Sequence, residues 1–225
     1  MPINTLETRA AILNVVSCAL TLPTFGAWSA RLELDTEDPA DLIGPATLTL
    51  HPDDSTAPRA LVGTLFSGSI RNGRATARLY PGNGGLIQEL PGKGYASLAA
   101  RLIAKDIANA AGEAIDPQSA GLDPILGIWA RRQATAAQQI SELCSFLGIP
   151  WKMTDAGQIR IGKPAATEYT PAPRVLFEDA DAQTQELDLP GVDLSPGHLL
   201  EGFTVDRVVY IFEQSARHTM IRYAA

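Results

Sequence analysis

The sequence contains little cysteine and little histidine. Cys18 and Cys144 each lie inside an apolar run, where a small buried residue is expected. A disulfide or a reactive thiol is the alternative, and cysteine usage leaves the redox compartment open. His51, His198 and His218 lie in separate segments without the spacing of metal ligands. A zinc site is therefore not indicated.

Positive charge is also scarce, because 18 Lys and Arg residues oppose 25 Asp and Glu residues for a net charge of −7. A stable complex with duplex DNA, which depends on counterion release, is disfavoured. No apolar run approaches the ~20 residues that span a bilayer. Residues 10–22 are apolar and loosely resemble a lipoprotein signal. Glu7 and Arg9 leave no net positive charge before them, so a buried strand is expected instead.

The glycine-rich segment 81–95 departs from the known phosphate-binding motifs. A P-loop requires Ser or Thr after Gly-Lys, but Gly92 and Lys93 are followed by Gly94. A dinucleotide fingerprint requires a helix to begin directly, and Pro91 prevents this. The segment is expected to be a loop at a domain boundary.

Catalytic motifs are missing as well. The acidic segment that begins at Asp179 has Thr184 and Pro190 at positions six and twelve, which an EF-hand does not tolerate, so a solvated acidic loop is expected. No Gly-x-Ser-x-Gly elbow occurs, and no sequence feature favours a pair of carboxylates. We therefore expect no enzymatic activity, no catalytic, cofactor-binding or metal-binding residues, and no cofactor.

Residues 1–90 have a β pattern. Trp28, Ala30, Leu32 and Leu34 alternate with polar residues, which is typical of a half-buried strand. Strands are also expected over 46–50 and 60–66. Asn72-Gly73 lies between two further candidate strands and is a strong hairpin signal. Short strands with frequent turns indicate a small barrel or sandwich.

The period then changes to that of a helix. Residues 97–112 are predicted to be helical, with Ser97 as N-cap and Gly112 just after the end. The predicted apolar face is Leu98, Leu102, Ile103, Ile107 and Ala110. Residues 116–127 carry two prolines and two glycines and are expected to be a loop.

A second helix is predicted to start at a capping box formed by Thr135 and Gln138 and to end at Gly148. Its buried stripe is predicted to be Ile140, Leu143, Cys144 and Leu147. A hairpin with a turn at 155–157 follows, and Trp151, Met153, Ile159 and Ile161 share one of its faces. The two helices and this hairpin are expected to pack as one module.

Residues 163–174 form a Pro/Ala linker, and β patterns return after it, ending in a long hairpin that turns near 213–217. The fold class is therefore mainly β with an α+β insertion. We expect an N-terminal β-barrel over 1–91 and an α/β module over 92–164. The segment 165–225 is expected to form a second small barrel or to complete the first one.

Five short segments occur in an order that resembles a known protein family. The most recognisable is 129–162, with an aromatic start, a helix, a Gly-x-x-Trp step and a hairpin around a glycine turn. The others are 20–34, 66–86, 93–113 and 195–210. Together they resemble the baseplate hub or tail hub proteins of long-tailed bacteriophages, with relatives in gene transfer agents, tailocins and type VI secretion spikes.

The resemblance implies a structural virion protein at the tail tip or baseplate. Such hubs are built from β-barrels with an α/β module and assemble as trimers around a channel. It implies a homo-oligomer, most often a trimer, and contacts with other tail proteins: a distal tail or tube protein, tip or fibre proteins, and the tape measure as a further candidate. DNA would be present in transit through the channel, where an acidic wall repels phosphates, and no stable membrane insertion is expected.

Two alternatives stay open. One is a distal tail or tube-end ring protein of the same tail, and ring order, three or six, separates it from a hub. The other is a carbohydrate-binding β module, which needs exposed aromatic residues, although aromatics are 6% of the chain. Trp129, next to Arg131-Arg132, is the candidate for an interface aromatic, and helix packing is its alternative role.

Overall fold

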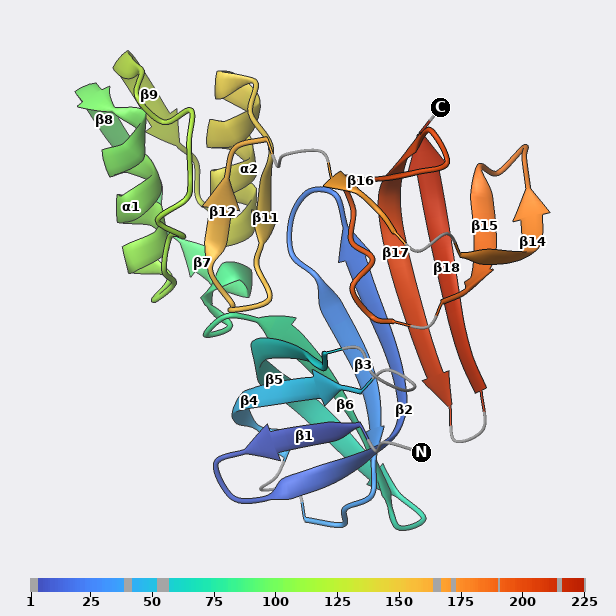
Figure 1. The fold of residues 1–225 in the computed structure, drawn as a ribbon. Helices are drawn as coiled ribbons and strands as arrows, with labels where there is room; N and C mark the ends of the chain where they lie inside the picture. The colour runs from blue at the N-terminus through green and yellow to red at the C-terminus, as the bar shows by residue number, and fades with distance from the viewer. Residues whose placement is uncertain are drawn as a thin grey trace. The chain divides into compact units, whose positions relative to one another are not determined.

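The computed structural model describes residues 4–38, 42–51, 57–163, 167–170, 173–189, 191–213 and 216–224 (Figure 1). The chain divides into two compact units. Unit 1 comprises Met1–Thr24, Trp28–Tyr80 and Pro164–Ala225, and unit 2 comprises Phe25–Ala27 and Pro81–Lys163. The long segment of unit 2 is Pro81–Lys163, and the sequence analysis placed the α/β module at 92–164. The fold is mainly β, with a small barrel and a two-helix module, as predicted.

Unit 1 is built on a 12-stranded sheet. Its strands are β1 (Thr5–Thr8), β2 (Ile12–Pro23), β3 (Ser29–Leu34), β4 (Gly44–Leu50), β5 (Arg59–Arg71), β6 (Arg74–Pro81), β13 (Thr167–Glu168), β14 (Arg174–Asp179), β15 (Thr184–Asp188), β16 (His198–Leu200), β17 (Phe203–Glu213) and β18 (Ala216–Ala224).

The first six strands close into a barrel in the order β1–β4–β5–β6–β3–β2, because β2 pairs back onto β1. Apolar and polar residues alternate along these strands, so each strand has one face buried in the barrel and one face outside it. In β3 the side chains of Ala30, Leu32 and Leu34 are buried, and the intervening residues face outward. Asn72 and Gly73 both have positive φ, at 53° and 76°, which confirms the predicted β5–β6 hairpin turn.

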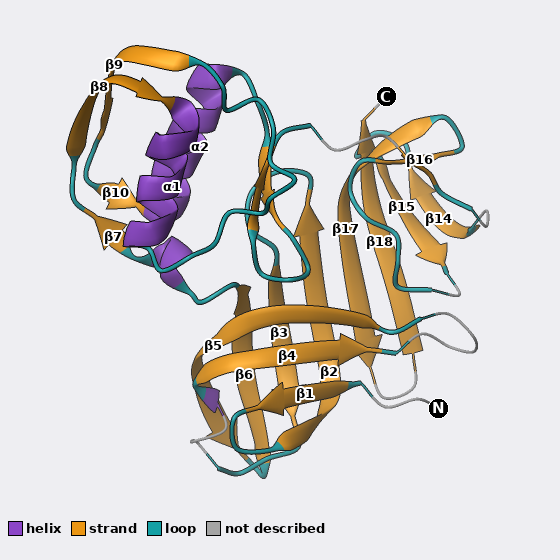
Figure 2. Ribbon diagram, turned by 60° about the vertical axis from the view of Figure 1, so that its left-hand side comes forward, coloured by secondary structure: helices purple, strands orange, loops and turns teal. Residues whose placement is uncertain are grey.

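Strand β2 joins the barrel to the remaining strands. Its residues Ile12–Asn14 pair with β1, its residues Cys18–Pro23 pair with β17, and β3 runs along the opposite edge. A register shift between Val15 and Ser17 marks a bulge, which bends a strand and increases its twist. One strand therefore closes the barrel with its first half and carries β17 on its second (Figure 2).

Strands β17, β18, β15 and β14 extend the sheet in that order. The barrel closes without residues 165–225, so they do not complete it; their assignment to a second small barrel stays a prediction. The predicted C-terminal hairpin is confirmed by the pairing of Glu213 with Ala216, although its turn residues 214–215 lie outside the described residues.

A strap, residues 191–197, packs against side chains of β5 and β17. Val192 and Leu194 are buried. The Arg59 guanidinium donates to the carbonyls of both residues, at 3.1 and 3.3 Å, and the Tyr210 hydroxyl donates to the Leu194 carbonyl at 2.9 Å. The strap thereby links β5 of the barrel with β17, because its carbonyls accept from side chains on both strands.

Unit 2 contains both helices and three two-stranded ribbons. Its elements are the 3-10 turn η2 (Gly85–Ile87), β7 (Glu89–Leu90), β8 (Lys93–Ala99), α1 (Ala100–Ala110), β9 (Ile125–Arg131), β10 (Ala134–Thr135), α2 (Ala136–Leu147), β11 (Trp151–Met153) and β12 (Ile159–Ile161). β8 pairs with β9, β10 with β7, and β11 with β12.

The first helix begins later than the sequence predicted. Ser97 lies in β8 with a φ of 47°, and the N-cap position is held by Ala99, which provides no side-chain cap. Residues 93–99, partly expected to be loop, pair with β9, and β9 itself starts inside the predicted loop 116–127. Gly112, with a φ of 70°, follows the C-cap as predicted.

The buried face of α1 also differs from the predicted one. Leu102 is 48% exposed, Ala110 is exposed, and Leu98 lies in β8. The buried residues are Ala100, Ile103, Ala104, Ile107 and Ala108. Three of these residues are alanines, whose small side chains let neighbouring elements approach closely. The predicted face was based mainly on large apolar residues and therefore left them out.

The second helix and its hairpin agree with the predictions. Thr135 and Gln138 form the capping box, and Gly148 ends α2 in the left-handed conformation. Ile140, Leu143 and Cys144 are buried, although Leu147 is partly exposed. The predicted hairpin face, Trp151, Met153, Ile159 and Ile161, is buried throughout.

Candidate functional site

The glycine-rich turn after β6 holds an anion that belongs to the same unit. The Glu113 carboxylate accepts hydrogen bonds from the backbone N–H of Asn83 at 3.0 Å and of Gly85 at 2.7 Å. Glu113 is 5% exposed. Burial raises the pKa of this carboxyl, and the backbone N–H groups around it oppose that effect only in part. The turn is therefore an N–H nest filled by Glu113, which occupies the place that a phosphate would take.

Two glycines make this close approach possible. A Cβ on Gly82 would lie 2.3 Å from Glu113 Oε2, and a Cβ on Gly85 would lie 1.6 Å from the Ala111 carbonyl oxygen. Sequence reasoning excluded a P-loop correctly and missed the nest. The acceptor stands 28 residues beyond Gly85 and carries no motif of its own.

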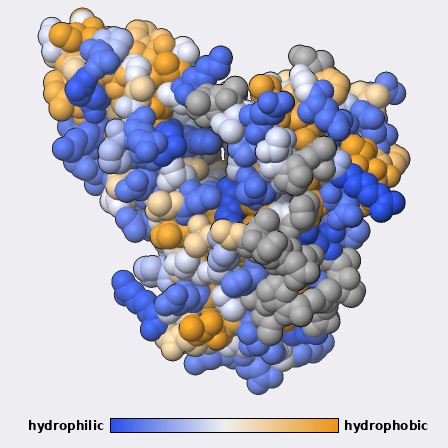
Figure 3. Space-filling model, in the orientation of Figure 1, coloured by the Kyte–Doolittle hydropathy of each residue, from blue (hydrophilic) through white to orange (hydrophobic). Residues whose placement is uncertain are grey.

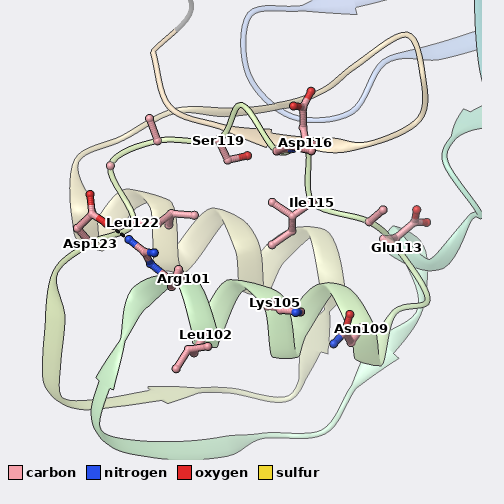
Figure 4. A pocket seen from close by; sticks show the side chains of 14 residues that line it. Arg101, Leu102, Lys105, Asn109, Glu113, Ile115, Asp116, Ser119, Leu122 and Asp123 are labelled. Carbon is pink, nitrogen blue, oxygen red and sulfur yellow. Dashed lines mark hydrogen bonds and ion pairs between the residues drawn. The ribbon is translucent and has the colours of Figure 1, made fainter.

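A groove of about 650 Å³ runs between α1 and the connection 113–123 (Figure 4). Lys105 and Asn109 line it from the helix, and Ile115 and Leu122 line it from the connection. At one end the Arg101 guanidinium forms an ion pair with Asp123. The groove therefore has an apolar floor and a polar rim.

The buried carboxylates of the groove are already engaged. Asp116 accepts from Nε and Nη2 of Arg160, at 2.9 and 2.6 Å, and from the backbone N–H of Gln118 at 2.7 Å. Glu113 is held by the nest. Neither carboxylate is available to act as a general acid or base without breaking these bonds.

A charged cluster lies under the β8–β9 ribbon. Asp106 of α1 accepts from the Tyr95 hydroxyl at 2.6 Å and from Lys93 at 2.8 Å, and Arg131 lies 3.6 Å away. The Arg131 side chain is 4% exposed, so this guanidinium depends on a nearby negative charge. Burial raises the pKa of Asp106, but the hydrogen bonds from Lys93 and Tyr95 and the charges of Lys93 and Arg131 outweigh burial and lower it.

Trp129 belongs to this same packed layer. It is 8% exposed, and its ring centroid lies 5.8 Å from that of Tyr95. The structure thus gives Trp129 an interior packing role and not the exposed position of an interface aromatic.

The remaining sequence candidates are dispersed. His198 stacks on Tyr169, and His218 contacts Glu186 at 2.7 Å. Cys18 and Cys144 are buried free thiols in different units, as expected. Within the described ranges, no group of three or more His, Cys, Asp or Glu side chains could hold a metal ion. No helix in the described part of the chain is long and apolar enough to cross a membrane.

Two exposed surfaces are apolar. On the β8–β9 ribbon, Ile125 and Ile128 are exposed, and Figure 3 shows apolar atoms gathered over these strands at its upper left. On β14, the last strand of the large sheet, every residue is exposed, including Leu176 and Phe177. Exposed apolar side chains of this kind are candidates for contact with another protein.

Comparison with solved structures places this fold among phage tail proteins. The 43 kDa tail protein of prophage MuSo2 from Shewanella oneidensis matches with a TM-score of 0.67 and 10% identity, over 99% of this chain and 98% of that one. A tail protein from Neisseria meningitidis MC58 matches with a TM-score of 0.67 and 12% identity, over 98% of this chain and 95% of that one.

A third match comes from a secretion system. The E. coli c3393 protein, described as a type VI secretion component structurally similar to the T4 tail proteins gp27 and gp5, matches with a TM-score of 0.69 and 12% identity, over 98% of this chain and 77% of that one. No protein-family model matches the sequence, and no curated protein matches it. The fold that the sequence resemblance implied is therefore confirmed: the chain has the fold of phage tail structural proteins.

Proposed function

We propose that the chain is a structural hub protein that forms a ring at the tail tip or baseplate of a virion and joins the tail tube to the distal tip. One observation carries the proposal: nearly the whole chain superposes on two tail proteins, one of them from a prophage, and on a secretion component likened to tail proteins. Such breadth at 10–12% identity is typical of a conserved scaffold whose sequence has diverged.

The internal construction of unit 1 supports an assembly role. A closed barrel and a further set of strands share one continuous sheet through β2. The sheet ends at β14, whose outer edge no described strand covers. Natural proteins usually protect such an edge, and an apolar one is a site for pairing with another chain.

The proposed partners follow from this place in the tail. Further copies of the chain make the ring, and the neighbours above and below are a tube or distal tail protein and a tip, fibre or tape measure protein. DNA would pass through the ring without stable binding. A net charge of −7 supports this, because an acidic surface repels phosphates.

Light scattering of the purified chain, followed by negative-stain averaging, tests the ring. A threefold ring with an open centre supports the hub, whereas a sixfold ring favours the tube-end protein. Gold labelling of an epitope on this chain in assembled particles tests the location. Label at the tail tip is expected, and particles that lack the label while containing a complete tip would refute the proposal.

A further inference from the structure

Two regions of the large sheet in unit 1 carry charges of opposite sign: the hairpin of β5 and β6 in the barrel, and the terminal strands β14 and β15. Residues 57–88, which include β5 and β6, contain Arg59, Arg71, Arg74 and Arg78 and no Asp or Glu. Residues 175–193, which include most of β14 and all of β15, contain no Lys or Arg. The acidic residues of that second segment are Glu178, Asp179, Asp181, Glu186, Asp188 and Asp193. Arg174 lies opposite Asp188, and β18 on the other side of β15 adds Arg222 opposite Thr184 and His218 beside Glu186, so the acidic residues still outnumber the cations around them.

The acidic end is an exposed strand edge. β14 pairs with β15 on one side, and all six of its residues are exposed. Phe177 is 62% exposed, and Asp181 in the β14–β15 turn and Asp188 at the end of β15 are also exposed. Asp181 and Asp188 form no ion pair with any residue that the structure describes. This end therefore combines apolar area with an excess of negative charge, although Asp188 lies opposite Arg174.

The β5–β6 hairpin of the barrel carries the opposite charge and is called the basic end below. Ile70, Arg71 and Arg78 are exposed, and nearby Ile43 is 73% exposed. Arg74 is paired with Glu33 at 2.9 Å, whereas Arg71 and Arg78 have no ion-pair partner among the described residues. On the barrel surface Arg78 stands directly beside Arg31 of β3, so no carboxylate neutralises it along that row.

We infer that the acidic β14–β15 end of one copy docks on the basic β5–β6 hairpin of the next copy. This inference rests on the proposed ring and names the contact that would build it. The occupant is a second copy of this chain, because the opposite surface that each end requires is present on the same molecule.

The charges also select the kind of contact. Pairing hairpin with hairpin would oppose guanidinium groups, so a contact between two basic ends is disfavoured. A contact between two different surfaces of the same protein is heterologous. Such a contact builds a ring where its rotation closes and an open filament where it does not, whereas a contact between identical surfaces stops at a dimer.

Charge reversal tests this contact in three variants of the full chain. Asp181→Lys with Asp188→Lys makes the acidic end basic, and Arg71→Glu with Arg78→Glu makes the basic end acidic. Each pair is expected to weaken self-association by about tenfold or more, because like charges then face each other. The third variant carries all four changes, which restores opposite signs, and its assembly is expected to return.

Arg9→Glu with Lys105→Glu is the matched control. Both residues are exposed, and the change in net charge equals that of the basic-end variant. Sedimentation at low and high salt gives the association constant, and wild-type assembly is expected to weaken in salt. Circular dichroism and urea unfolding verify that every variant is folded.

Several outcomes overturn the inference: unchanged assembly in either reversed variant, a folded four-change variant that stays monomeric, or a wild-type chain that stays monomeric at low salt and at its highest soluble concentration. Gold labelling separates these failures from failure of the proposed function. If the chain is found at the tail tip and charge reversal has no effect on assembly, the proposed contact is refuted and the proposed function stands. If the chain is absent from tails but its self-association changes with charge reversal as expected, the proposed function is refuted and the proposed contact stands.

Discussion

The backbone N–H of Gly85 donates a 2.7 Å hydrogen bond to the Glu113 carboxylate, and the α-carbon of Gly85 faces the Ala111 carbonyl so closely that no side chain fits between them. This contact ties the turn that enters unit 2 to the end of α1. Both helices and the β8–β9 ribbon follow that turn in the chain, so their placement within unit 2 depends on it.

Gly85→Ala is expected to destabilise unit 2 severely. The new Cβ would stand 1.6 Å from a backbone oxygen, and a backbone atom cannot move away as the tip of a flexible side chain can. A loss of about 3 kcal/mol or more in the free energy of unfolding is expected, as for strongly overpacked sites. Gly94→Ala is the control, because nothing lies within 4 Å of the Cβ it would add. Urea unfolding measures both, and equal stability of the two variants would contradict the prediction.

Glu113→Gln is expected to cost about 1–3 kcal/mol, because the amide cannot accept from every N–H group that the carboxylate satisfies. The folded state raises the pKa of Glu113 above its ordinary value, so the proton is bound more tightly in the folded chain. The contribution of this group to stability is therefore lost as pH rises through the raised pKa. The stability advantage of the wild type over Glu113→Gln should narrow as pH rises from about 4 toward neutrality. An advantage that widens over this interval would show that the nest holds the charged form more tightly than the neutral one.

Local patterns in the sequence predicted the elements whose signals are complete within a few residues. Thr135 and Gln138 cap α2, Gly148 ends it, and Asn72-Gly73 turns the β5–β6 hairpin, as the sequence indicated. Each signal depends on hydrogen bonds or φ angles of adjacent residues, which tertiary contacts did not override.

The predictions were wrong where pairing between strands that lie far apart in the sequence determines the structure. Serine is a favourable N-cap residue, so Ser97 was predicted to start the helix. Instead β8 continues to Ala99, because Ala99 still pairs with Ile125 of β9. Likewise, the partner of Gly85 in the nest is 28 residues away, and the use of one β2 edge by both β1 and β17 depends on chain ends far apart in sequence. No periodicity within one segment encodes such pairings, and for the same reason the one interface aromatic that the sequence suggested, Trp129, is buried in the structure.

Asp106→Asn is expected to destabilise unit 2 by about 1–3 kcal/mol, since it leaves Arg131 buried without its counter-charge. Asp123→Asn is the control: Asp123 also pairs with an arginine, but its side chain is 79% exposed, and a change below about 1 kcal/mol is expected. Similar losses in both variants would show that burial of Arg131 does not matter.

The same substitution has a pH signature of the opposite sign to that of Glu113. Although burial raises the pKa of Asp106, its hydrogen bonds and cationic neighbours lower it overall. Its stabilisation is therefore present above the ordinary carboxyl pKa, near 3.9, and is lost as pH falls through the lowered value. Acid unfolding of the wild type should show this loss, and the Asp106→Asn variant should lack that part of the pH dependence.

The two thiols allow each unit to be followed separately. Burial raises the pKa of Cys18 and of Cys144 to about 12, so almost no reactive thiolate exists at pH 8 in the folded chain. Both are expected to resist alkylation in the native protein and to react on unfolding, with each site read by peptide mass spectrometry. Cys18 lies in β2 of unit 1 and Cys144 in α2 of unit 2. Gly85→Ala should therefore accelerate labelling of Cys144 well before that of Cys18. Acceleration of both thiols together would mean that the two units unfold as one cooperative body, and rapid reaction of either thiol in the wild type would contradict its burial.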